Sequence, residues 1–220
     1  MKWLIRRLAD ELLHKAGSAK FQRYSQALDL SLEYLKGSSA ETELVAILSN
    51  SLGDDDANVR YRAAQSLGQL GQATPEAVEA LMGALGDGYA DVRYRATESL
   101  GQLGQAAPEV VQVLLDGAHL APSWSTRRDC INLVGKIGKY DQQTVDVLLM
   151  GFTDQDNGVR AACAQALARL GQRNPEAVEE IASTLIQTLE DPKFGPVDPY
   201  AKRTGYDYAF DALWMLIVGE

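Results

Sequence analysis

The sequence predicts an all-α fold, a right-handed α-solenoid of about five to six stacked helix pairs. Two observations predict it. The segment 59–78, VRYRAAQSLGQLGQATPEAV, returns almost unchanged at 92–111 as VRYRATESLGQLGQAAPEVV, and further copies begin at 126 and 159. Within each copy, apolar residues recur at the 3.6-residue period of a helix. A repeat of roughly 33 residues with this periodicity is typical of arrays in which neighbouring helix pairs share one continuous core.

The first element in chain order is residues 1–36, where we expect a helical cap and a degenerate first repeat. A predicted helix over 1–16 carries apolar residues on one side, namely Trp3, Leu4, Leu8 and Leu12. Two roles fit this helix. It covers the open end of the array, which solenoids need, or it lies on an anionic membrane surface through its basic residues. A second helix is expected over about 21–35, before Gly37.

Residues 37–191 are expected to hold the repeats, each made of a helix, a short turn and a second helix. In the first clear copy, the spacing of four apolar residues lines one face of the second helix: Val59, Ala63, Leu67 and Leu70. A glycine follows each such helix and is expected to end it: Gly71, Gly104, Gly138 and Gly171. Three prolines, each followed by glutamate, are expected to begin the next helix: Pro75, Pro108 and Pro175.

Residues 192–220 depart from the repeat. A loop insertion rich in Pro, Gly and aromatic residues is expected over 192–205, followed by a C-terminal capping helix. In that helix Phe210, Trp214 and Met215 replace small or polar residues, so it is apolar on nearly all sides. An exposed apolar helix predicts a contact. Three contacts fit this helix: a second copy of the chain in a homodimer, the loop over 192–205, or a further part of a longer protein. With the repeats, these segments are expected to make one continuous domain.

Each repeat also carries polar residues at fixed places, in the pattern Asp-x-x-x-x-Val-Arg-x-x-Ala-x-x-x-Leu-x-x-Leu-Gly. Asp54 precedes Arg60, Asp87 precedes Arg93 and Asp154 precedes Arg160 at the same spacing. This pattern resembles HEAT repeats, in particular the short type of the phycobilisome lyases, over roughly residues 40–218. The recurring arginines are expected to pair inside the array, with the aspartates either capping a helix or pairing with a neighbouring arginine. The resemblance implies a helical solenoid and leaves the function open, because this scaffold serves many roles.

Charge and composition exclude some classes of partner and location. The chain has a net charge of −9, with seven Lys/Arg against four Asp/Glu in residues 1–36. The negative charge of the whole chain argues against a nucleic-acid partner, and the small basic excess in residues 1–36 segregates the cations only in part. No apolar run is long enough to span a membrane, and the charged N-terminus lacks the apolar centre of a signal peptide, so a cytoplasmic location is expected. Cys130 and Cys163 occupy the alanine position of the core, where small buried residues are expected.

Catalysis finds no support in the sequence. His14 and His119 have no metal-ligand or nucleophile companion at a usable spacing. The recurrent Leu-Gly-Gln-Leu-Gly ends a helix, whereas a phosphate-binding loop begins one. We therefore expect no enzyme activity, no cofactor and no metal.

A partner is expected on the concave side, which the second helices of such arrays line. The register identifies the outward positions, where Tyr and Arg recur, and these residues are enriched at interaction hot spots. Tyr61 and Tyr94 could instead shield neighbouring helices. The candidate partner-binding residues are Tyr61, Arg62, Gln65, Tyr94, Arg95, Glu98, Arg128 and Asn132.

Trp124 joins these candidates from the irregular third copy. There Ala121 replaces the recurrent aspartate within DGAHLAPSWSTRR. A tryptophan in a turn either anchors a partner or folds back over the core.

Three functions remain open. The first is a non-catalytic scaffold for a protein or peptide. The second follows from the resemblance to phycobilisome lyases, which implies a protein that handles bilins, with Arg62, Arg95 and Arg128 meeting the propionates. The third follows from the C-terminal segment, which is similar to the terminal repeat of NACHT-type signalling NTPases and implies the sensor part of a longer chain.

Overall fold

The computed structural model of the chain describes residues 39–195 and 203–218. Every regular element within these ranges is an α-helix or a 3-10 turn, which confirms the predicted all-α class. Five helix pairs follow one another in the described part. The cap and degenerate repeat expected in 1–36, and part of the loop expected in 192–205, lie outside the described residues. The chain divides into two compact units, Met1–Val110 and Val111–Glu220.

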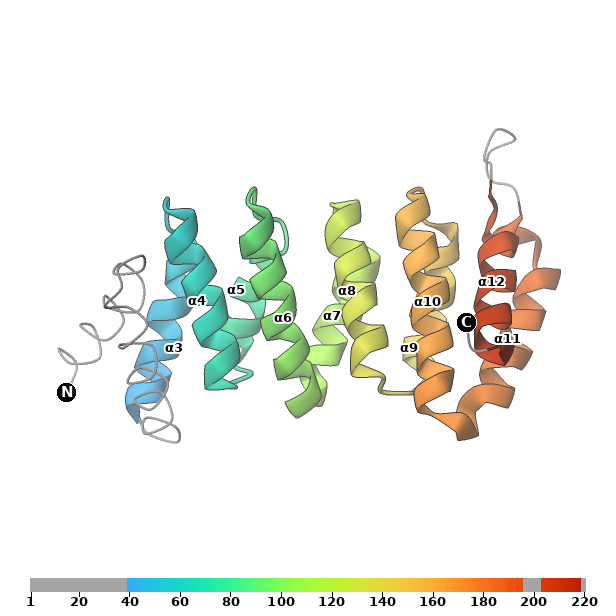
Figure 1. Cartoon of the computed structure of the whole chain (residues 1–220), viewed down its shortest axis with the longest axis horizontal. Coiled ribbons are helices and arrows are strands. Elements are labelled where there is room, and N and C mark those ends of the chain that lie inside the picture. Colours follow the sequence, from blue (N-terminus) through green and yellow to red (C-terminus); the bar gives the residue numbers. More distant parts are fainter. Residues whose placement is uncertain (1–38, 196–202, 219–220) are drawn as a thin grey trace. The chain divides into compact units, whose positions relative to one another are not determined.

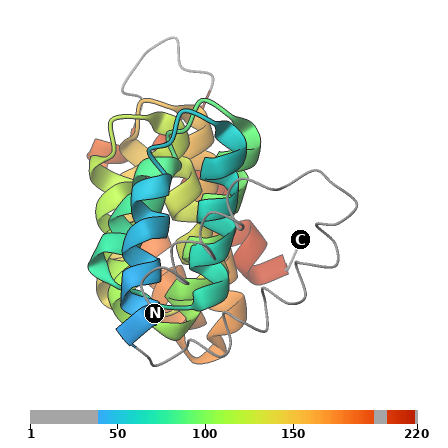
Figure 2. The same ribbon diagram turned by 90° about the vertical axis from the view of Figure 1, so that its left-hand side faces the viewer.

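Unit 1 contains two layers of helices. From residue 39 on, its helices are α3 (Ser39–Ser51), α4 (Ala57–Leu70), α5 (Pro75–Ala84) and α6 (Ala90–Ala106). Within this unit α4 packs beside α6, while α3 and α5 contact each other behind them (Figures 1 and 2). We call α4 and α6 the second-helix layer of unit 1, and α3 and α5 its first-helix layer. The order of helix, turn and second helix that the sequence predicted for each repeat is therefore present.

The core of unit 1 lies between these layers. Val59, Ala63, Leu67 and Leu70 are each at most 4% exposed, as the helical spacing predicted. Leu44 of α3 and Leu81 of α5 are fully buried on the other side. Small residues let α4 and α6 approach closely: the Ser99 hydroxyl donates to the Ala64 carbonyl at 2.7 Å, and a methyl group on Gly68 would overlap Ser99. The residues of α4 and α6 that point away from the first-helix layer therefore do not contribute to this core.

Unit 2 repeats the arrangement, and the boundary between the units falls in the first turn of α7 (Pro108–Leu120). Its other helices are α8 (Trp124–Ile137), α9 (Gln142–Met150), α10 (Asn157–Arg173), α11 (Val178–Glu190) and α12 (Gly205–Val218). Three 3-10 turns, η1 (Gly151–Thr153), η2 (Pro175–Ala177) and η3 (Pro192–Phe194), join them. Helix α10 packs between α8 and α12, which form the second-helix layer of this unit, and α9 and α11 form its first-helix layer (Figure 1).

The second helix ends at the predicted glycine in two repeats and continues past it in the other two. Gly71 and Gly138 end α4 and α8 in the left-handed conformation, with φ of 71° and 70°. The expectation for Gly104 and Gly171 was wrong, because α6 continues to Ala106 and α10 to Arg173. Helix α6 ends where Ala107 adopts the extended backbone favoured before a proline.

Gly171 has a packing role instead. It is buried inside α10, and a methyl group there would overlap the Leu216 side chain of α12. Asn174 ends α10, and its side-chain amide donates to the carbonyls of Leu170 at 2.7 Å and Gly138 at 3.0 Å. The glycine is thus required for a close approach between helices rather than for a turn.

The prolines begin helices as expected. Pro75 is the first residue of α5, where the Thr74 hydroxyl accepts a hydrogen bond from the Ala77 amide at 3.2 Å. Pro108 is the first residue of α7. Pro175 begins the 3-10 turn η2, which leads directly into α11.

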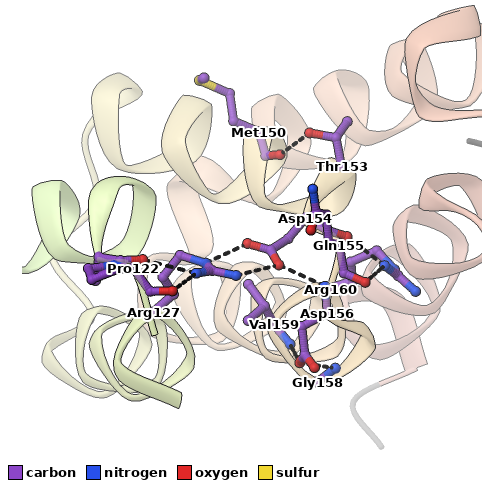
Figure 3. A network of polar contacts seen from close by, with 11 residues as sticks. Pro122, Arg127, Met150, Thr153, Asp154, Gln155, Asp156, Gly158, Val159 and Arg160 are labelled. Atoms are coloured by element: carbon purple, nitrogen blue, oxygen red, sulfur yellow. Dashed lines mark hydrogen bonds and ion pairs between the residues drawn. The ribbon is translucent and has the colours of Figure 1, made fainter. Parts of the chain in front are cut away.

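An arginine–aspartate pair joins consecutive repeats in each unit. In unit 1 the Arg60 guanidinium donates to both carboxylate oxygens of Asp87, at 2.6 and 3.0 Å, and to its own loop carbonyl at Asp54. In unit 2 Arg127 binds Asp154 in the same way, at 2.7 and 2.9 Å (Figure 3). It also donates to the carbonyl of Ala121. The expected pairing with a neighbouring arginine is confirmed at these two positions.

The second role expected for these aspartates, helix capping, belongs to other residues. Asp56 caps α4 by accepting from the Asn58 amide, and Asp156 caps α10 by accepting from the amides of Gly158 and Val159. Asp54 and Asp154 accept from the amide two residues further along the loop, at 2.8 Å. These aspartates therefore shape the loop that the arginines bind.

The ion pairs make stability depend on pH. Hydrogen bonds from Arg60 hold the pKa of Asp87 below its ordinary value. Burial alone would raise the pKa of Asp154, but the hydrogen bonds from Arg127 and the Asp156 amide, together with the positive charges of Arg127 and Arg160, outweigh it and the pKa is lowered. A lowered pKa in the folded state stabilises the fold above the unfolded-state pKa of about 4, and this contribution is lost as the pH falls from there through the folded-state pKa.

We therefore expect the urea midpoint to fall as the pH is lowered from about 5 to 3, and to fall less in an Asp87→Asn, Asp154→Asn double variant. Circular dichroism at each pH measures this. Equal pH dependence of the two proteins would contradict the assignment.

Both cysteines are core residues, as expected. Cys130 and Cys163 are fully buried and free. Burial raises the pKa of the Cys130 thiol to about 12 and raises the pKa of Cys163 as well. Since the reactive form of cysteine is the thiolate, these side chains serve packing.

Candidate partner-binding surface

The outward residues of α4 and α6 form one surface of unit 1. Because the apolar residues of both helices face the first-helix layer, the intervening positions point away from it. Tyr94 is 64% exposed, whereas Tyr61, Arg95 and Glu98 are half-buried. The two tyrosines are thus outside the core. We call this set the α4–α6 surface, formed by Tyr61, Arg62, Gln65, Tyr94, Arg95 and Glu98.

Arg95 lies at the centre of this surface. Its Nε donates to the hydroxyl of Tyr61 on α4 at 2.6 Å, and its Nη1 donates to Glu98 one turn along α6 at 2.7 Å. The guanidinium carbon also lies 5.0 Å from the ring centroid of Tyr61 and 5.8 Å from that of Tyr94. These distances are typical of cation–π contacts. The side chain is therefore held in one orientation before any partner arrives.

The two arginines of the α4–α6 surface sit in different electrostatic settings. Burial alone would lower the pKa of Arg95, but hydrogen bonds to Tyr61 and Glu98 together outweigh it and raise the pKa. Burial lowers the pKa of Arg62, with a smaller opposing effect from Tyr61. Both guanidiniums remain charged at neutral pH. A partially desolvated charge interacts more strongly with an opposite charge than a fully hydrated one does.

The remaining candidates, Trp124, Arg128 and Asn132, lie on α8 in unit 2. The expected turn position of Trp124 was wrong, because it is the first residue of α8; its side chain is 48% exposed. The Arg128 guanidinium lies 5.1 Å from a ring centroid of Trp124 and forms an ion pair with Asp129 at 3.2 Å. An arginine held against an exposed aromatic ring, with a carboxylate beside it, therefore occurs in both units.

Unit 2 also contains two adjoining cavities that the sequence did not indicate. One has a volume of about 570 Å³ and the other about 280 Å³, and they share Met150, Lys193 and Phe194 in their linings. Lys193 pairs with Asp191 at 3.1 Å, and its ammonium group lies 4.6 Å from the Phe194 ring centroid. His119 lines the larger cavity. Among the residues that the structure describes, no group of three or more His, Cys, Asp or Glu is arranged to hold a metal ion.

Helix α12 exposes one apolar side. Tyr208, Ala209, Ala212 and Leu216 are buried, whereas Phe210, Trp214, Ile217 and Val218 are exposed. The homodimer expected through this helix stays a prediction. Within the described ranges, no helix combines the length and apolar character needed to cross a bilayer.

Comparison with known proteins identifies the repeat. A family model described as HEAT repeats matches residues 41–127 and 111–193. A solved structure titled "Crescerin uses a TOG domain array to regulate microtubules in the primary cilium" is 15% identical and covers 98% of this chain and 92% of its own, with a TM-score of 0.65.

A second solved structure resembles the chain less closely. The structure of the Pds5–Scc1 complex is 16% identical and covers 98% of this chain and 40% of its own, with a TM-score of 0.50. At these identities the likeness shows the fold alone, an α-solenoid. No curated protein matched the chain significantly.

Proposed function

The chain belongs to the HEAT-repeat family, and we propose that it is a non-catalytic scaffold that binds a protein or peptide partner on its second-helix layer. This is the side expected to be concave. The observation that carries the proposal is the combination on the α4–α6 surface of an exposed tyrosine, Tyr94, with an arginine, Arg95, that is already held in place.

Pre-organisation supports this role for Arg95. A free arginine loses up to about 2 kcal/mol of side-chain entropy when a partner immobilises it. Tyr61 and Glu98 already restrict this side chain, so less of that cost remains for binding. Tyr94 adds a large, rigid and exposed ring beside it. Tyr and Arg are the residue types that most often dominate the binding energy of an interface.

The experiment begins with a partner captured from native cell extract and continues with its dissociation constant. Alanine at Tyr94 or at Arg95 is expected to weaken binding by about 10- to 30-fold, which corresponds to roughly 1.4–2 kcal/mol. The matched control is Tyr89→Ala, because Tyr89 has the same chemistry and is 62% exposed but lies at the N-terminus of α6. The control is expected to change the affinity by less than about twofold. If Tyr94→Ala, Arg95→Ala and Tyr89→Ala changed the dissociation constant equally, the partner would not bind at the α4–α6 surface.

Bilin handling is the second candidate function. The specific observation in its favour is that Arg95 and Arg128 each lie against aromatic rings, a setting that suits a flat ligand with carboxylates. Titration with a free bilin would shift the bilin absorbance if this function holds, and an unchanged spectrum would remove it.

Two further hypotheses concern the C-terminal segment, one from the exposed side of α12 and one from the resemblance of this segment to the terminal repeat of NACHT-type NTPases. A homodimer through this helix predicts that Trp214→Glu lowers the sedimenting mass from dimer to monomer, and a monomeric wild type would exclude the dimer. The sensor role in a longer NTPase predicts that the natural gene continues upstream of Met1.

A further inference from the structure

The charges of unit 1 are separated by layer. Helices α4 and α6 carry four arginines and two carboxylates, whereas α3 and α5 carry four glutamates and no Lys or Arg. Arg60 and Arg93 are engaged with the repeat loops, Arg60 with Asp87 and Arg93 with the Asp87 carbonyl at 2.7 Å. The other two, Arg62 and Arg95, belong to the α4–α6 surface. In the described part of this unit, residues 39–110, positive charge outside the loops is therefore gathered on one surface.

Unit 2 separates its charges in the same way. Helices α8 and α10 carry six Lys or Arg and one carboxylate, Asp129. Helices α9 and α11 carry four carboxylates and no Lys or Arg. Only α12 breaks the pattern in the second-helix layer of this unit, with Asp207 and Asp211. Because the same separation occurs in both units, it follows the repeat rather than one local cluster.

The aromatic rings of the α4–α6 surface are not arranged to receive a cation. Tyr61 and Tyr94 both lie within cation–π distance of the guanidinium of Arg95. An incoming lysine or arginine would meet that guanidinium and Arg62, and like charges repel at short range. A carboxylate would instead find an oriented guanidinium, whose planar N–H groups match its geometry. The chemistry of this surface is that of an anion receptor.

The spacing of the two arginines suits an extended peptide. Arg62 and Arg95 stand at equivalent positions of α4 and α6, because both directly follow the tyrosine of the repeat. Axes of packed helices lie roughly 8–10 Å apart. An extended chain in the polyproline II conformation has three residues per turn and advances about 3.1 Å per residue, so side chains three residues apart lie on the same side, about 9 Å from each other. Two carboxylates at this interval would each meet one arginine.

We propose that the α4–α6 surface binds an extended acidic peptide segment, with carboxylates three residues apart against Arg62 and Arg95 and an apolar side chain against Tyr94. This inference rests on the proposed scaffold function and names the chemical class of its partner. A nucleic acid fits less well, since its closely spaced phosphates require a dense basic stripe and the chain as a whole carries a charge of −9.

The probes are fluorescent peptides made of repeated Glu-Phe-Gly triplets, with Gln-Phe-Gly and Lys-Phe-Gly peptides of equal length and a single-stranded RNA for comparison. Fluorescence anisotropy with the full chain measures each affinity. We expect the glutamate peptide to bind at least about tenfold more tightly than the glutamine peptide, and its affinity to fall as salt is added. Equal affinity for these two peptides, or tighter binding of the lysine peptide or the RNA, would overturn the proposal.

Variants locate the site. Arg62→Gln, Arg95→Gln and Tyr94→Ala are each expected to weaken binding of the glutamate peptide by about five- to tenfold, whereas Tyr89→Ala leaves it unchanged. Glu98→Gln is expected to strengthen it by about two- to threefold, because the glutamine side-chain oxygen can still accept from Arg95 and orient it but no longer competes as a negative charge. If Glu98→Gln weakens binding, the carboxylate does not meet Arg95 and the proposal fails.

The two proposals can fail separately. If Tyr94→Ala releases the captured partner but the glutamate peptide has no advantage, the acidic-peptide inference fails and the scaffold function stands. If neither the partner nor the peptide responds to changes at Tyr94 and Arg95, the scaffold function itself is misplaced.

Discussion

Replacing Asp154 with alanine is expected to lower the free energy of unfolding by about 2–3 kcal/mol. The change removes two charge-assisted hydrogen bonds from Arg127 and one from the Asp156 amide. Only 16% of the Arg127 side chain and 13% of the Asp154 side chain are exposed. The effect therefore lies between that of an exposed pair, up to about 1 kcal/mol, and that of a fully buried one, about 3–5 kcal/mol. Urea unfolding followed by circular dichroism measures it.

Asp146→Ala is the control for this change. Asp146 lies on the exposed side of α9, where it accepts one hydrogen bond from the Gln142 side chain. Its removal is expected to change stability by less than about 0.5 kcal/mol. Arg127→Ala should destabilise to a similar degree as Asp154→Ala, and the double variant should cost much less than the sum. Additive losses would show that the pair does not couple the two repeats.

Gly135→Ala is expected to destabilise the protein by up to about 2 kcal/mol, although alanine is the better helix former. A methyl group on Gly135 of α8 would lie 2.9 Å from both the Cα and the Cβ of Ala166 on α10. Since the backbone of α10 cannot move aside cheaply, overpacking costs about 1–3 kcal/mol. The gain in helix propensity is only about 1 kcal/mol. Packing therefore outweighs propensity at this position, and the urea midpoint should fall.

The same substitution at Gly83 should have the opposite sign. Gly83 lies in the last turn of α5, and a methyl group there would contact nothing within 4 Å. Gly83→Ala is expected to raise the free energy of unfolding by up to about 1 kcal/mol. If both variants were stabilised, α8 and α10 would not pack as closely as the structure has them.

Much of the fold could be predicted because the same pattern of apolar residues occurs in several copies of the repeat. Val59, Ala63, Leu67 and Leu70 recur one repeat later, so the buried side of each second helix was evident. The outward register of Tyr61 and Tyr94 followed from the same periodicity. Local spacing thus determined which residues face the core and which do not.

Other features depend on contacts between elements, and local patterns predicted them only in part. Gly71 and Gly171 occupy the same place in the repeat, but one takes a left-handed turn and the other makes room for Leu216. The hydrogen bond from Arg95 to Tyr61 joins residues 34 positions apart, and no local pattern indicated it. The separation of charge between layers was readable from the sequence, once charges were counted helix by helix instead of from end to end.

A partner is expected to bind the second-helix layer rather than the first. The most direct test places a photo-activated cross-linking amino acid at Gln102, an exposed residue of α6, and separately at Glu79, an exposed residue of α5. After irradiation with the captured partner, we expect a discrete cross-linked product from position 102 and none from position 79. A product from position 79 alone, or equal yields from the two, would contradict it.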